Sequence, residues 1–303
     1  MLYVIYPDVE IWQYMLQDYK EDRDGIRIRA LNQNCKKWQL AMRKIFNNSR
    51  LPSVFLFNQR LRKELSALKG GDSVLLCDYA DPVLAKAINS LVSPVVKKHF
   101  WIWNPVTDKD RSFYSHAFKV MNVNGFRLAT FDKHDAKIFN IDYYPQFYRM
   151  DMDKKEDFEI LYDFYFIGAS KGRDKIINSL NETLSSKYKT YLKLVNKKSD
   201  SITYSENINN VIHSRCLIDI VQAGQSGLTL RPLEALAYNK KLISNNKNLI
   251  KCDFYHKDNI FILGIDKLED IDTFMQSPCR QIEDSIRSKY DTANWVKNFM
   301  NYI

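Results

Sequence analysis

Short apolar runs alternate with longer amphipathic stretches along the first half of the chain, and this pattern predicts strands and helices in turn. The run at residues 73–77, SVLLC, is almost entirely apolar, as expected for a strand buried on both faces of a parallel sheet. Asp81 stands directly before Pro82, which is the order of a helix N-cap followed by the first helical residue. We predict strands at 2–6, 26–31, 73–77, 99–103, 126–131 and 136–139, and helices at 36–46, 59–68, 82–92 and 113–120.

The pattern breaks at residues 143–157, where a proline and clustered aromatic residues precede a charge run, and then it starts again. In the second half we predict strands at 163–167, 188–194, 216–221, 242–244 and 260–263, helices at 173–185, 206–214 and 232–237, and a long terminal helix at 282–302. Such alternation predicts parallel sheets covered by helices. The expected fold class is therefore α/β, with two Rossmann-like domains that face each other across a cleft.

The expected domain boundaries follow from the same pattern. Residues 1–145 form the first domain, 146–160 the linker and 161–280 the second domain. Residues 281–303 form a terminal segment whose apolar stripe either packs back towards the first domain or docks on the second.

Composition agrees with a globular protein of this kind. The chain has 303 residues, enough for two domains that each bury a core, and its 45% hydrophobic and 27% charged residues exclude a disordered chain. The five cysteines are far apart and include no CxxC pair, so neither a disulfide framework nor a zinc site is expected. No apolar run approaches the roughly 18 residues that span a bilayer, and the N-terminus reads as a strand rather than a signal peptide. We therefore expect a cytoplasmic protein with reduced thiols.

The stretch at residues 222–242, QAGQSGLTLRPLEALAYNKKL, is the most informative in the chain. Pro232 suits the first position of a helix, and a helix N-terminus favours an anion. Arg231 beside that end can bind a phosphate through two hydrogen bonds, and Glu234 can accept hydrogen bonds from a ribose diol. This spacing suits a nucleoside diphosphate. The alternative is a loop and a helix in which Glu234 only complements the helix dipole.

A second stretch, FIGASKGRD at residues 166–174, ends a strand with Gly168 and opens a helix after a small basic loop. Glycine lets a phosphate approach the backbone, while Ser170, Lys171 and Arg173 can supply hydrogen-bond donors. The stretch matches neither GxxxxGK[ST] nor GxGxxG. An ordinary strand–turn–helix junction explains it equally well.

The two stretches, in this order and about 60 residues apart, resemble the donor domain of GT-B glycosyltransferases. The run at 204–246 resembles bacterial enzymes that build lipopolysaccharide, O-antigen or capsule glycans, and its LTLRPLEALA core is similar to the donor motif of phage DNA glucosyltransferases. The resemblance covers residues 163–264 and extends to the first half only as architecture. It implies that Arg231 contacts the donor diphosphate and Glu234 the ribose. It also implies donor contacts from Gly168, Ser170, Lys171, Arg173, Gly227 and Thr229.

The stretch departs from the pattern of retaining enzymes, which carry two glutamates eight residues apart, because only the second has a counterpart here, in Glu234. This favours an inverting mechanism, in which a carboxylate or histidine takes the proton of the acceptor hydroxyl. Asp78 and Asp81 follow a buried strand and Asp108 follows the next, at the edge where open α/β sheets bind ligands. Asp81 also suits the role of a helix cap, so we favour Asp78.

Near the same edge, Trp103 and Asn104 could contact an acceptor sugar or belong to the core. No cofactor and no metal are expected, because the histidines are scattered and the DxD match at Asp151 and Asp153 falls in the predicted linker. The net charge of +9 reflects either codon usage or an affinity for polyanions such as anionic lipid. The candidate basic patch consists of Lys36, Lys37, Lys44, Arg60, Arg62 and Lys63.

The function expected from these observations is transfer of a sugar from a nucleotide-sugar to a glycan or lipid-linked oligosaccharide, in bacterial surface polysaccharide synthesis. Such an enzyme would work in the cytoplasm, with peripheral contact to the cytoplasmic face of the inner membrane. One alternative is a DNA-modifying glucosyltransferase, although the chain has no recognisable DNA-reading module. Another is a non-catalytic protein that binds nucleotides or glycans.

Overall fold

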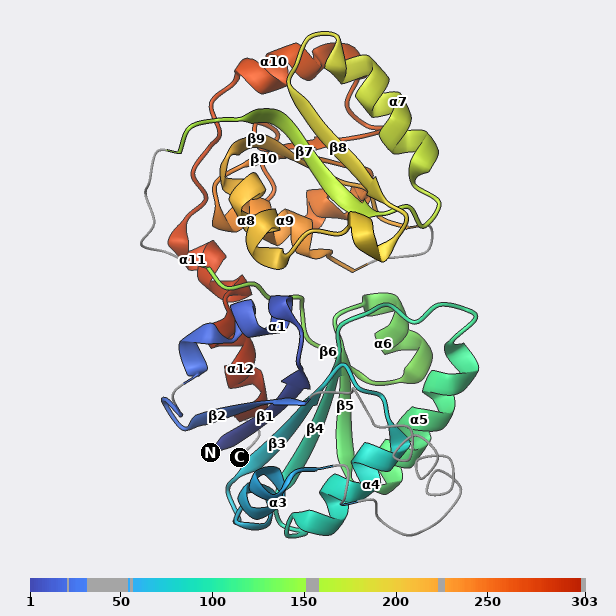
Figure 1. Ribbon diagram of the computed structural model, residues 1–303, viewed down its shortest axis with the longest axis vertical. Coiled ribbons are helices and arrows are strands. Elements are labelled where there is room, and N and C mark those ends of the chain that lie inside the picture. The colour runs from blue at the N-terminus through green and yellow to red at the C-terminus, as the bar shows by residue number, and fades with distance from the viewer. Residues whose placement is uncertain (21, 32–53, 55–56, 151–157, 223–226, 301–303) are drawn as a thin grey trace. The chain divides into compact units, whose positions relative to one another are not determined.

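The computed structural model describes residues 1–20, 22–31, 54, 57–150, 158–222 and 227–300, and the chain divides into two compact units. Unit 1 comprises Met1–Pro145 together with the segment that starts at Trp295, and unit 2 comprises Gln146–Asn294. Each unit is an α/β structure around one parallel sheet (Figure 1). Within the described residues, no helix has the length and apolar character needed to cross a membrane.

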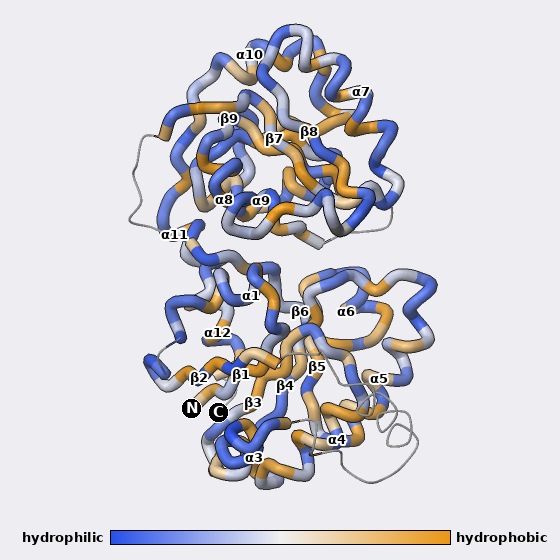
Figure 2. Tube along the Cα trace, viewed as in Figure 1, coloured by the Kyte–Doolittle hydropathy of each residue, from blue (hydrophilic) through white to orange (hydrophobic). Residues whose placement is uncertain are grey.

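Unit 1 is built on a six-stranded sheet in the order β2-β1-β3-β4-β5-β6, in which neighbouring strands run parallel. Every residue of β1 and β3 is buried, and Figure 2 shows apolar residues concentrated along the strands. The strands are β1 (Leu2–Pro7), β2 (Ile26–Leu31), β3 (Ser73–Cys77), β4 (Lys97–Ile102), β5 (Phe126–Thr130) and β6 (Asp142–Tyr143). The first five confirm strands predicted from the sequence.

Helices cover both faces of this sheet. The core on one face includes residues of α3 (Gln59–Ser66), α4 (Pro82–Leu91) and α5 (Arg111–Val123). Asn58 caps α3 by accepting a hydrogen bond from the Leu61 backbone at 2.9 Å. On the other face lie aromatic residues of α1 (Glu10–Met15) and α12 (Thr292–Met300), and the short η1 (Gln17–Tyr19) follows α1. The helix expected at 36–46 lies outside the described residues.

The segment 136–139 is helical, so the strand predicted there is wrong. It belongs to α6 (Lys133–Phe139). Asp132 is almost completely buried and caps this helix by accepting hydrogen bonds from the backbone of His134 at 2.7 Å and of Asp135 at 3.3 Å. This local capping bond favours a helix over a strand for the few apolar residues that follow.

The single terminal helix predicted at 282–302 is also wrong, because the chain breaks at Asp291. The segment contains α11 (Asp284–Arg287), η6 (Ser288–Tyr290) and then α12. The Asp291 backbone is extended, and its carboxylate accepts hydrogen bonds from the backbone of Met150 and of Ala293, each at 2.8 Å. These bonds end one helical segment and start the next. Tyr302, at the end of the predicted helix, lies outside the described residues.

Helix α12 completes the second face of the unit 1 sheet through its aromatic side chains. The Trp295 ring lies 5.0 Å from Trp101 of β4 and 6.3 Å from Trp12 of α1. Phe299, one turn further on, lies 5.8 Å from the ring of His99. All three tryptophans are almost completely buried, so the first and last parts of unit 1 share one aromatic core.

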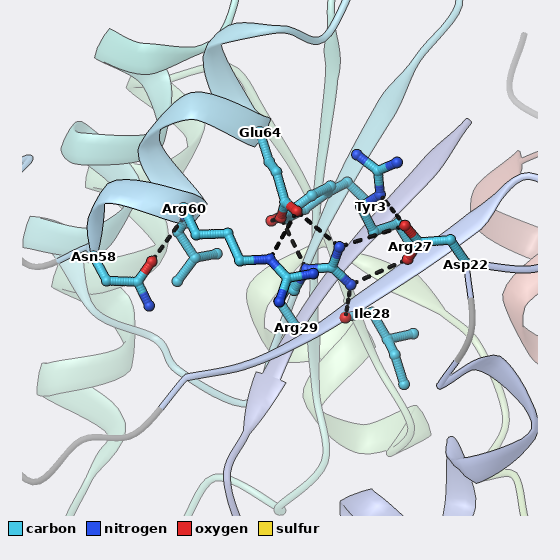
Figure 3. Close-up of polar contacts among 9 residues, drawn as sticks. Tyr3, Asp22, Arg27, Ile28, Arg29, Asn58, Arg60 and Glu64 are labelled. Carbon is cyan, nitrogen blue, oxygen red and sulfur yellow. Dashed lines mark hydrogen bonds and ion pairs between the residues drawn. The ribbon is translucent and has the colours of Figure 1, made fainter.

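A charged network ties the edge strand β2 to α3 (Figure 3). Arg29 donates to both carboxylate oxygens of Glu64 at 2.8 Å and to Asp22 at 3.1 Å. Tyr3 and Arg60 donate to the same glutamate at 2.5 and 3.0 Å. Burial opposes the charge of Glu64, but these hydrogen bonds outweigh it and lower its pKa to about 2. The network is satisfied internally, which indicates a structural role.

Unit 2 is built on a five-stranded parallel sheet in the order β11-β10-β9-β7-β8. Its strands are β7 (Tyr162–Ala169), β8 (Thr190–Val195), β9 (Ser214–Asp219), β10 (Lys241–Ser244) and β11 (Ile260–Ile262). Its helices are α7 (Asp174–Ser185), η3 (Lys198–Asp200), α8 (Tyr204–Ile212), α9 (Leu230–Ala237), η4 (Lys247–Lys251), η5 (Leu268–Asp270) and α10 (Ile271–Gln276). All five predicted strands are confirmed, with end shifts of up to two residues.

The two faces of this sheet carry different helices. Phe166 points to the face covered by α7 and α10, where it belongs to the apolar core. Tyr165 points the other way along β7, and its hydroxyl donates to Asn207 of α8 at 3.0 Å. Tyr165 and Phe166, at consecutive positions of β7, therefore lie on opposite faces of the sheet.

The order of the strands sets a switch point in each sheet. In unit 2 the chain leaves β7 for β8 on one side and later returns to β9 on the other. In unit 1 it passes from β1 to β2 and then to β3 on the opposite side. Open α/β sheets bind ligands outside the carboxyl ends of the strands that flank such a point. A ligand site is therefore expected at the loops after β7 and β9 in unit 2, or at those after β1 and β3 in unit 1.

Candidate functional site

A cavity of about 520 Å³ lies at the carboxyl ends of β7, β9 and β10 in unit 2. This volume is within the range of small-molecule sites. Its lining holds three cations and four side-chain amides but no carboxylate. The lining residues are Lys171, Gly172, Arg173, Ile176, Ile220, Val221, Gln222, Asn245, Asn246, Lys247 and Asn248. The cavity therefore presents a positive, hydrogen-bonding wall at the switch point of the sheet.

The loop after β7 supplies one side of this cavity. Lys171 and Gly172 have left-handed backbones, with φ of 42° and 81°, which turns the chain sharply into α7. Lys171 is exposed and has no acidic partner among the described residues. Ser170 does not line the cavity, and its hydroxyl donates to Asp174 in the first turn of α7 at 2.5 Å. Of the predicted loop contacts, Lys171 is thus free to meet a ligand and Ser170 is already engaged.

Arg173 joins the carboxyl ends of two strands. Its guanidinium donates to the carbonyl of Ala169 and, at 3.1 Å, to that of Ile220, and it lies 5.4 Å from the ring of Phe166. A Cβ at Gly168 would lie 3.0 Å from Nη2 of Arg173 and 3.2 Å from the Phe166 ring. A larger residue at position 168 would therefore have to push the Arg173 guanidinium and the Phe166 ring aside by a few tenths of an ångström. Burial lowers the pKa of Arg173, and its charge still faces the cavity.

Helix α9 starts earlier than the sequence indicates, so the prediction that Pro232 is its first residue is wrong. The helix begins at Leu230 after Thr229, which puts Pro232 in the third helical position. Its missing N–H is harmless there, because the first backbone N–H groups of a helix have no partner within it. The Thr229 hydroxyl donates to Asp219 at 2.7 Å, which fixes the start of the helix against the end of β9.

Glu234 is 3% exposed and has partners on both carboxylate oxygens. Oε2 lies 2.8 Å from Nη1 of Arg231, while Oε1 accepts hydrogen bonds from Tyr204 at 3.0 Å and from Asn207 at 3.1 Å. Arg231 also donates to the carbonyl of Ile167 at 3.2 Å. Glu234 is thus enclosed by protein partners, whereas the Arg231 side chain is 14% exposed, and neither residue lines the cavity.

Arg231 and Arg173 pack against side chains on opposite faces of β7. Arg231 lies 5.4 Å from the ring of Tyr165, whereas Arg173 lies at the same distance from Phe166. Both guanidiniums nevertheless reach the carboxyl end of β7, where Arg231 donates to the carbonyl of Ile167 and Arg173 to that of Ala169. Besides burial, the positive charge of Arg231 lowers the pKa of Arg173. Gly227 is buried and, like Thr229, does not line the cavity.

Three further polar features of this edge were not predicted from the sequence. Asp219, at the end of β9, is almost completely buried and accepts hydrogen bonds from Thr229 and, at 2.9 Å, from Ser244 of β10. Burial raises the pKa of Asp219. Asn245 bridges to the loop after β9, since its amide accepts from the Val221 backbone at 2.8 Å and donates back at 3.3 Å. The third feature is Asn246.

Asn246 is 4% exposed and follows Asn245 in the same loop. Its Oδ1 accepts a hydrogen bond from the Asn248 backbone at 3.1 Å, but its Nδ2 has no hydrogen-bond partner among the described residues. The sequence signal that could have identified this loop is the polar run Asn245 to Asn248 directly after a buried strand. It is the same signal that drew attention to the loop after β7.

The corresponding edge of unit 1 holds Asp78, directly after β3. Its backbone is left-handed, with φ of 59°, a conformation that aspartate, like asparagine, adopts more readily than most residues other than glycine. Its carboxylate accepts hydrogen bonds from the Asn104 amide at 3.2 Å and from the Trp103 backbone at 3.3 Å. Burial raises the pKa of Asp78 to about 6, although these hydrogen bonds partly oppose the shift. A shifted pKa at a strand end is common in functional sites.

The other two carboxylates predicted for this edge have local partners. Asp81 accepts a hydrogen bond from the Val83 backbone at 2.8 Å and caps α4, as the capping alternative predicts. Asp108 is 89% exposed and lies 2.7 Å from Arg111. Trp103 is partly exposed, with its ring 4.4 Å from that of Trp12. Asp78, in contrast, is partly buried, and this burial raises its pKa.

Within the part of the chain that the structure describes, no group of three His, Cys, Asp or Glu side chains could hold a metal ion. Asp151 and Asp153 of the DxD match lie outside the described residues, as do Lys36, Lys37 and Lys44 of the candidate basic patch. Of the remaining patch residues, Arg60 belongs to the network in Figure 3. The patch as a whole stays a prediction.

No protein-family model matches this chain, and no curated protein matches it at a significant level. A function for this protein therefore has to be argued from the chemistry of the two strand edges.

Proposed function

We propose that this protein is a GT-B-type glycosyltransferase that moves a sugar from a nucleotide-sugar to a glycan acceptor. The observation that carries the proposal is the cavity at the switch point of unit 2, with three cations and no carboxylate in its lining. Ligands of open α/β sheets bind at such crevices, and a volume of about 520 Å³ suits a nucleotide. The chain also contains two α/β units, each with a parallel sheet, as expected for a GT-B enzyme, which consists of two such domains.

In this proposal the cavity holds the nucleotide part of the donor. Lys171, Arg173 and Lys247 supply positive charge where the diphosphate would lie and where negative charge grows as it leaves. The proposal places this charge compensation on side chains, without a metal. The acceptor is a glycan or lipid-linked oligosaccharide of bacterial surface polysaccharide synthesis, which is the expectation from the sequence resemblance.

The predicted contacts of Arg231 with the diphosphate and of Glu234 with the ribose stay predictions. In the structure the two side chains bind each other, and Glu234 has further partners in Tyr204 and Asn207. Glu234 is buried, so the ribose of a donor could reach it only by replacing one of these bonds. We therefore assign the pair a positioning role in the proposal, because Arg231 holds the carbonyl of Ile167 near the end of β7.

Asp78 is the proposed base of an inverting transfer. The acceptor hydroxyl gives its proton to the Asp78 carboxylate while its oxygen forms a bond to C1 of the donor sugar. The bond from C1 to the diphosphate oxygen breaks, and the nucleoside diphosphate leaves with the electron pair. A base works best with a pKa near the working pH, and the pKa of about 6 for Asp78 meets this condition. Asn104 orients the carboxylate, and the partly exposed ring of Trp103 offers a surface for a sugar.

The proposal is tested first by nucleotide binding and then by enzymatic turnover. Thermal unfolding of the full chain is measured with UDP, GDP, CDP, CMP and dTDP, for the wild type and for Lys171→Gln, with Lys175→Gln as a matched control on the solvent side of α7. A ligand at about 100 times its Kd stabilises by about 2.7 kcal/mol. We expect one nucleotide to raise the melting temperature of the wild type and the control, and to raise it less in Lys171→Gln.

Absence of a shift with every nucleotide would contradict the proposal. A shift without release of nucleoside diphosphate from nucleotide-sugars in the presence of glycan acceptors would favour the non-catalytic binding protein. Release that requires DNA as the acceptor, together with salt-sensitive DNA binding, would favour the DNA-modifying enzyme. Turnover that survives in Asp78→Asn would remove Asp78 from the mechanism and leave the donor site intact.

A further inference from the structure

Asp219, the last residue of β9, has a buried carboxylate in which both oxygens are hydrogen-bonded. The residue is 4% exposed. Oδ1 accepts a hydrogen bond from the Thr229 hydroxyl at 2.7 Å, and Oδ2 accepts one from the Ser244 hydroxyl at 2.9 Å. Burial raises the pKa of Asp219, while these two bonds and the charges of Arg231 and Arg173 oppose the rise. A satisfied buried network of this kind rigidifies the segments that it connects.

The two hydroxyl groups belong to different segments at the carboxyl edge of the unit 2 sheet. Thr229 directly precedes α9, and Ser244 is the last residue of β10. The Ser244 hydroxyl also accepts from the backbone N–H of Asn246 at 3.0 Å, and the backbone N–H of Asn245 donates to the carbonyl of Asp219 at 3.3 Å. Both asparagines line the cavity. Asp219 therefore connects the start of α9 to the loop that forms part of the cavity wall.

This connection gives the motif at the start of α9 a route to the cavity. Thr229, Arg231 and Glu234 do not line the cavity themselves. The bond from Thr229 to Asp219 continues through the Ser244 hydroxyl to the Asn246 backbone. A change at the start of α9 can therefore shift the cavity wall although no residue of the motif touches a ligand there.

We propose that Asp219 is a positioning residue of the donor site, whose carboxylate fixes the start of α9 and the loop after β10 relative to each other so that this loop meets the nucleotide in one arrangement. The inference rests on the proposed function and refines it, because it gives Thr229 an indirect role in donor binding. A wall that is already ordered costs less conformational entropy when a ligand binds. Loss of either hydroxyl bond should therefore weaken nucleotide binding.

The experiment is calorimetric titration of the full chain with UDP, GDP, CDP, dTDP and inorganic pyrophosphate, at a temperature at which every variant is folded. Thr229→Val and Ser244→Ala each remove one hydroxyl, whereas Thr229→Ser keeps it. These changes leave the charge near the cavity unaltered, so they report on position alone. Thr190→Val is the matched control, because Thr190 is also partly buried, donates to Asn181 at 2.9 Å and does not line the cavity.

We expect Thr229→Val and Ser244→Ala each to weaken the nucleotide that binds the wild type by about 10-fold, as the loss of supporting hydrogen bonds does at metal sites. Thr229→Ser should bind as the wild type does. Thr190→Val should lower the melting temperature and leave the Kd unchanged. If Thr229→Val and Ser244→Ala also lower only the melting temperature, Asp219 has a purely structural role and the inference is wrong.

Asp219→Ala completes a double-mutant cycle with the two hydroxyl variants. In this background the hydroxyls have lost their common acceptor, so adding Thr229→Val or Ser244→Ala should change the Kd by less than about 2-fold. A full 10-fold effect of Thr229→Val in this background would show that Thr229 acts on the nucleotide without Asp219, which contradicts the inference. The single hydroxyl variants decide the question even if Asp219→Ala does not fold.

The same titrations separate this inference from the proposed function. If a nucleotide binds equally tightly to the wild type and to both hydroxyl variants, the positioning role is wrong and the proposed function stands. If only pyrophosphate binds, and its binding depends on both hydroxyls, the positioning role is supported and the proposed function fails. If no probe binds to the wild type, both are wrong.

Discussion

Replacing Asp78 by asparagine tests whether this carboxylate is held in an unfavourable environment. Its pKa is raised from the ordinary 3.8 to about 6, mainly by burial. The folded protein therefore holds this proton more tightly than the unfolded chain, so stability falls as the pH rises from about 4 to 6 and the whole cost is present above that range. A shift of about two pKa units corresponds to about 3 kcal/mol, and screening by solvent makes this an upper limit.

Asp78→Asn should therefore be more stable than the wild type by up to about 3 kcal/mol at pH 8, but by only about 1 kcal/mol at pH 4.5. The amide can still accept from the Trp103 backbone, and the exposed Asn104 can turn its own amide to match. Urea unfolding followed by tryptophan fluorescence measures the effect. The tryptophans among the described residues, Trp12, Trp101, Trp103 and Trp295, all belong to unit 1, as Asp78 does.

Asp108→Asn is the control, because that carboxylate is 89% exposed and should change stability little at either pH. An equal gain for Asp78→Asn at both pH values, or no gain at pH 8, would refute the reasoning about burial. The proposed mechanism also predicts that the substitution that stabilises the fold lowers the catalytic activity. The wild-type kcat/KM should rise with pH through about 6, and Asp78→Asn should lose about 10²- to 10⁴-fold in turnover.

Three further predictions concern the contacts that shape unit 2. Replacing Arg231 alone by methionine should destabilise the fold by about 3–5 kcal/mol, because the buried Glu234 loses its charged partner. Adding Glu234→Leu should recover much of this loss in thermal unfolding. If the double variant recovers nothing, the two side chains do not stabilise each other as a pair. Gly168→Ala should cost about 1–3 kcal/mol by displacing Arg173, whereas an unchanged melting temperature would show that the guanidinium can move at no cost. Asp291→Ala should cost about 1 kcal/mol through the lost helix cap, and hydrogen exchange should show faster opening of the start of α12.

The positions of the strands along the chain could be predicted from the sequence, because buried parallel strands appear as short apolar runs between turn residues. The runs at β1, β3 and β7 are examples. Two of the errors, the strand predicted within α6 and the single terminal helix, share one cause. Each depends on a single aspartate, Asp132 or Asp291, whose side chain accepts backbone N–H groups. A hydrophobic pattern does not register such bonds, so it misses where a helix starts or breaks.

Only some of the candidate site residues could be predicted from the sequence, and the reason is physical. Sequence position identifies which residues follow a strand, and this was sufficient to select Asp78, Lys171 and Arg173. It does not identify which of those side chains already have partners. Asp81 and Ser170 stand at equally suggestive positions, but one caps α4 and the other binds Asp174.

Arg231 and Lys247 illustrate the difference most sharply. Arg231 lies in the most suggestive motif of the chain, yet its guanidinium is paired with Glu234 only three residues away, on the face of β7 that carries α8. Lys247 lies in no motif, yet its ammonium group is exposed at the cavity without an acidic partner among the described residues. A charge acts on a ligand only to the extent that no neighbouring protein charge already neutralises it. The pairing of side chains, which the fold alone determines, therefore favours the loops after β7 and β10 over the motif as the phosphate-binding surface.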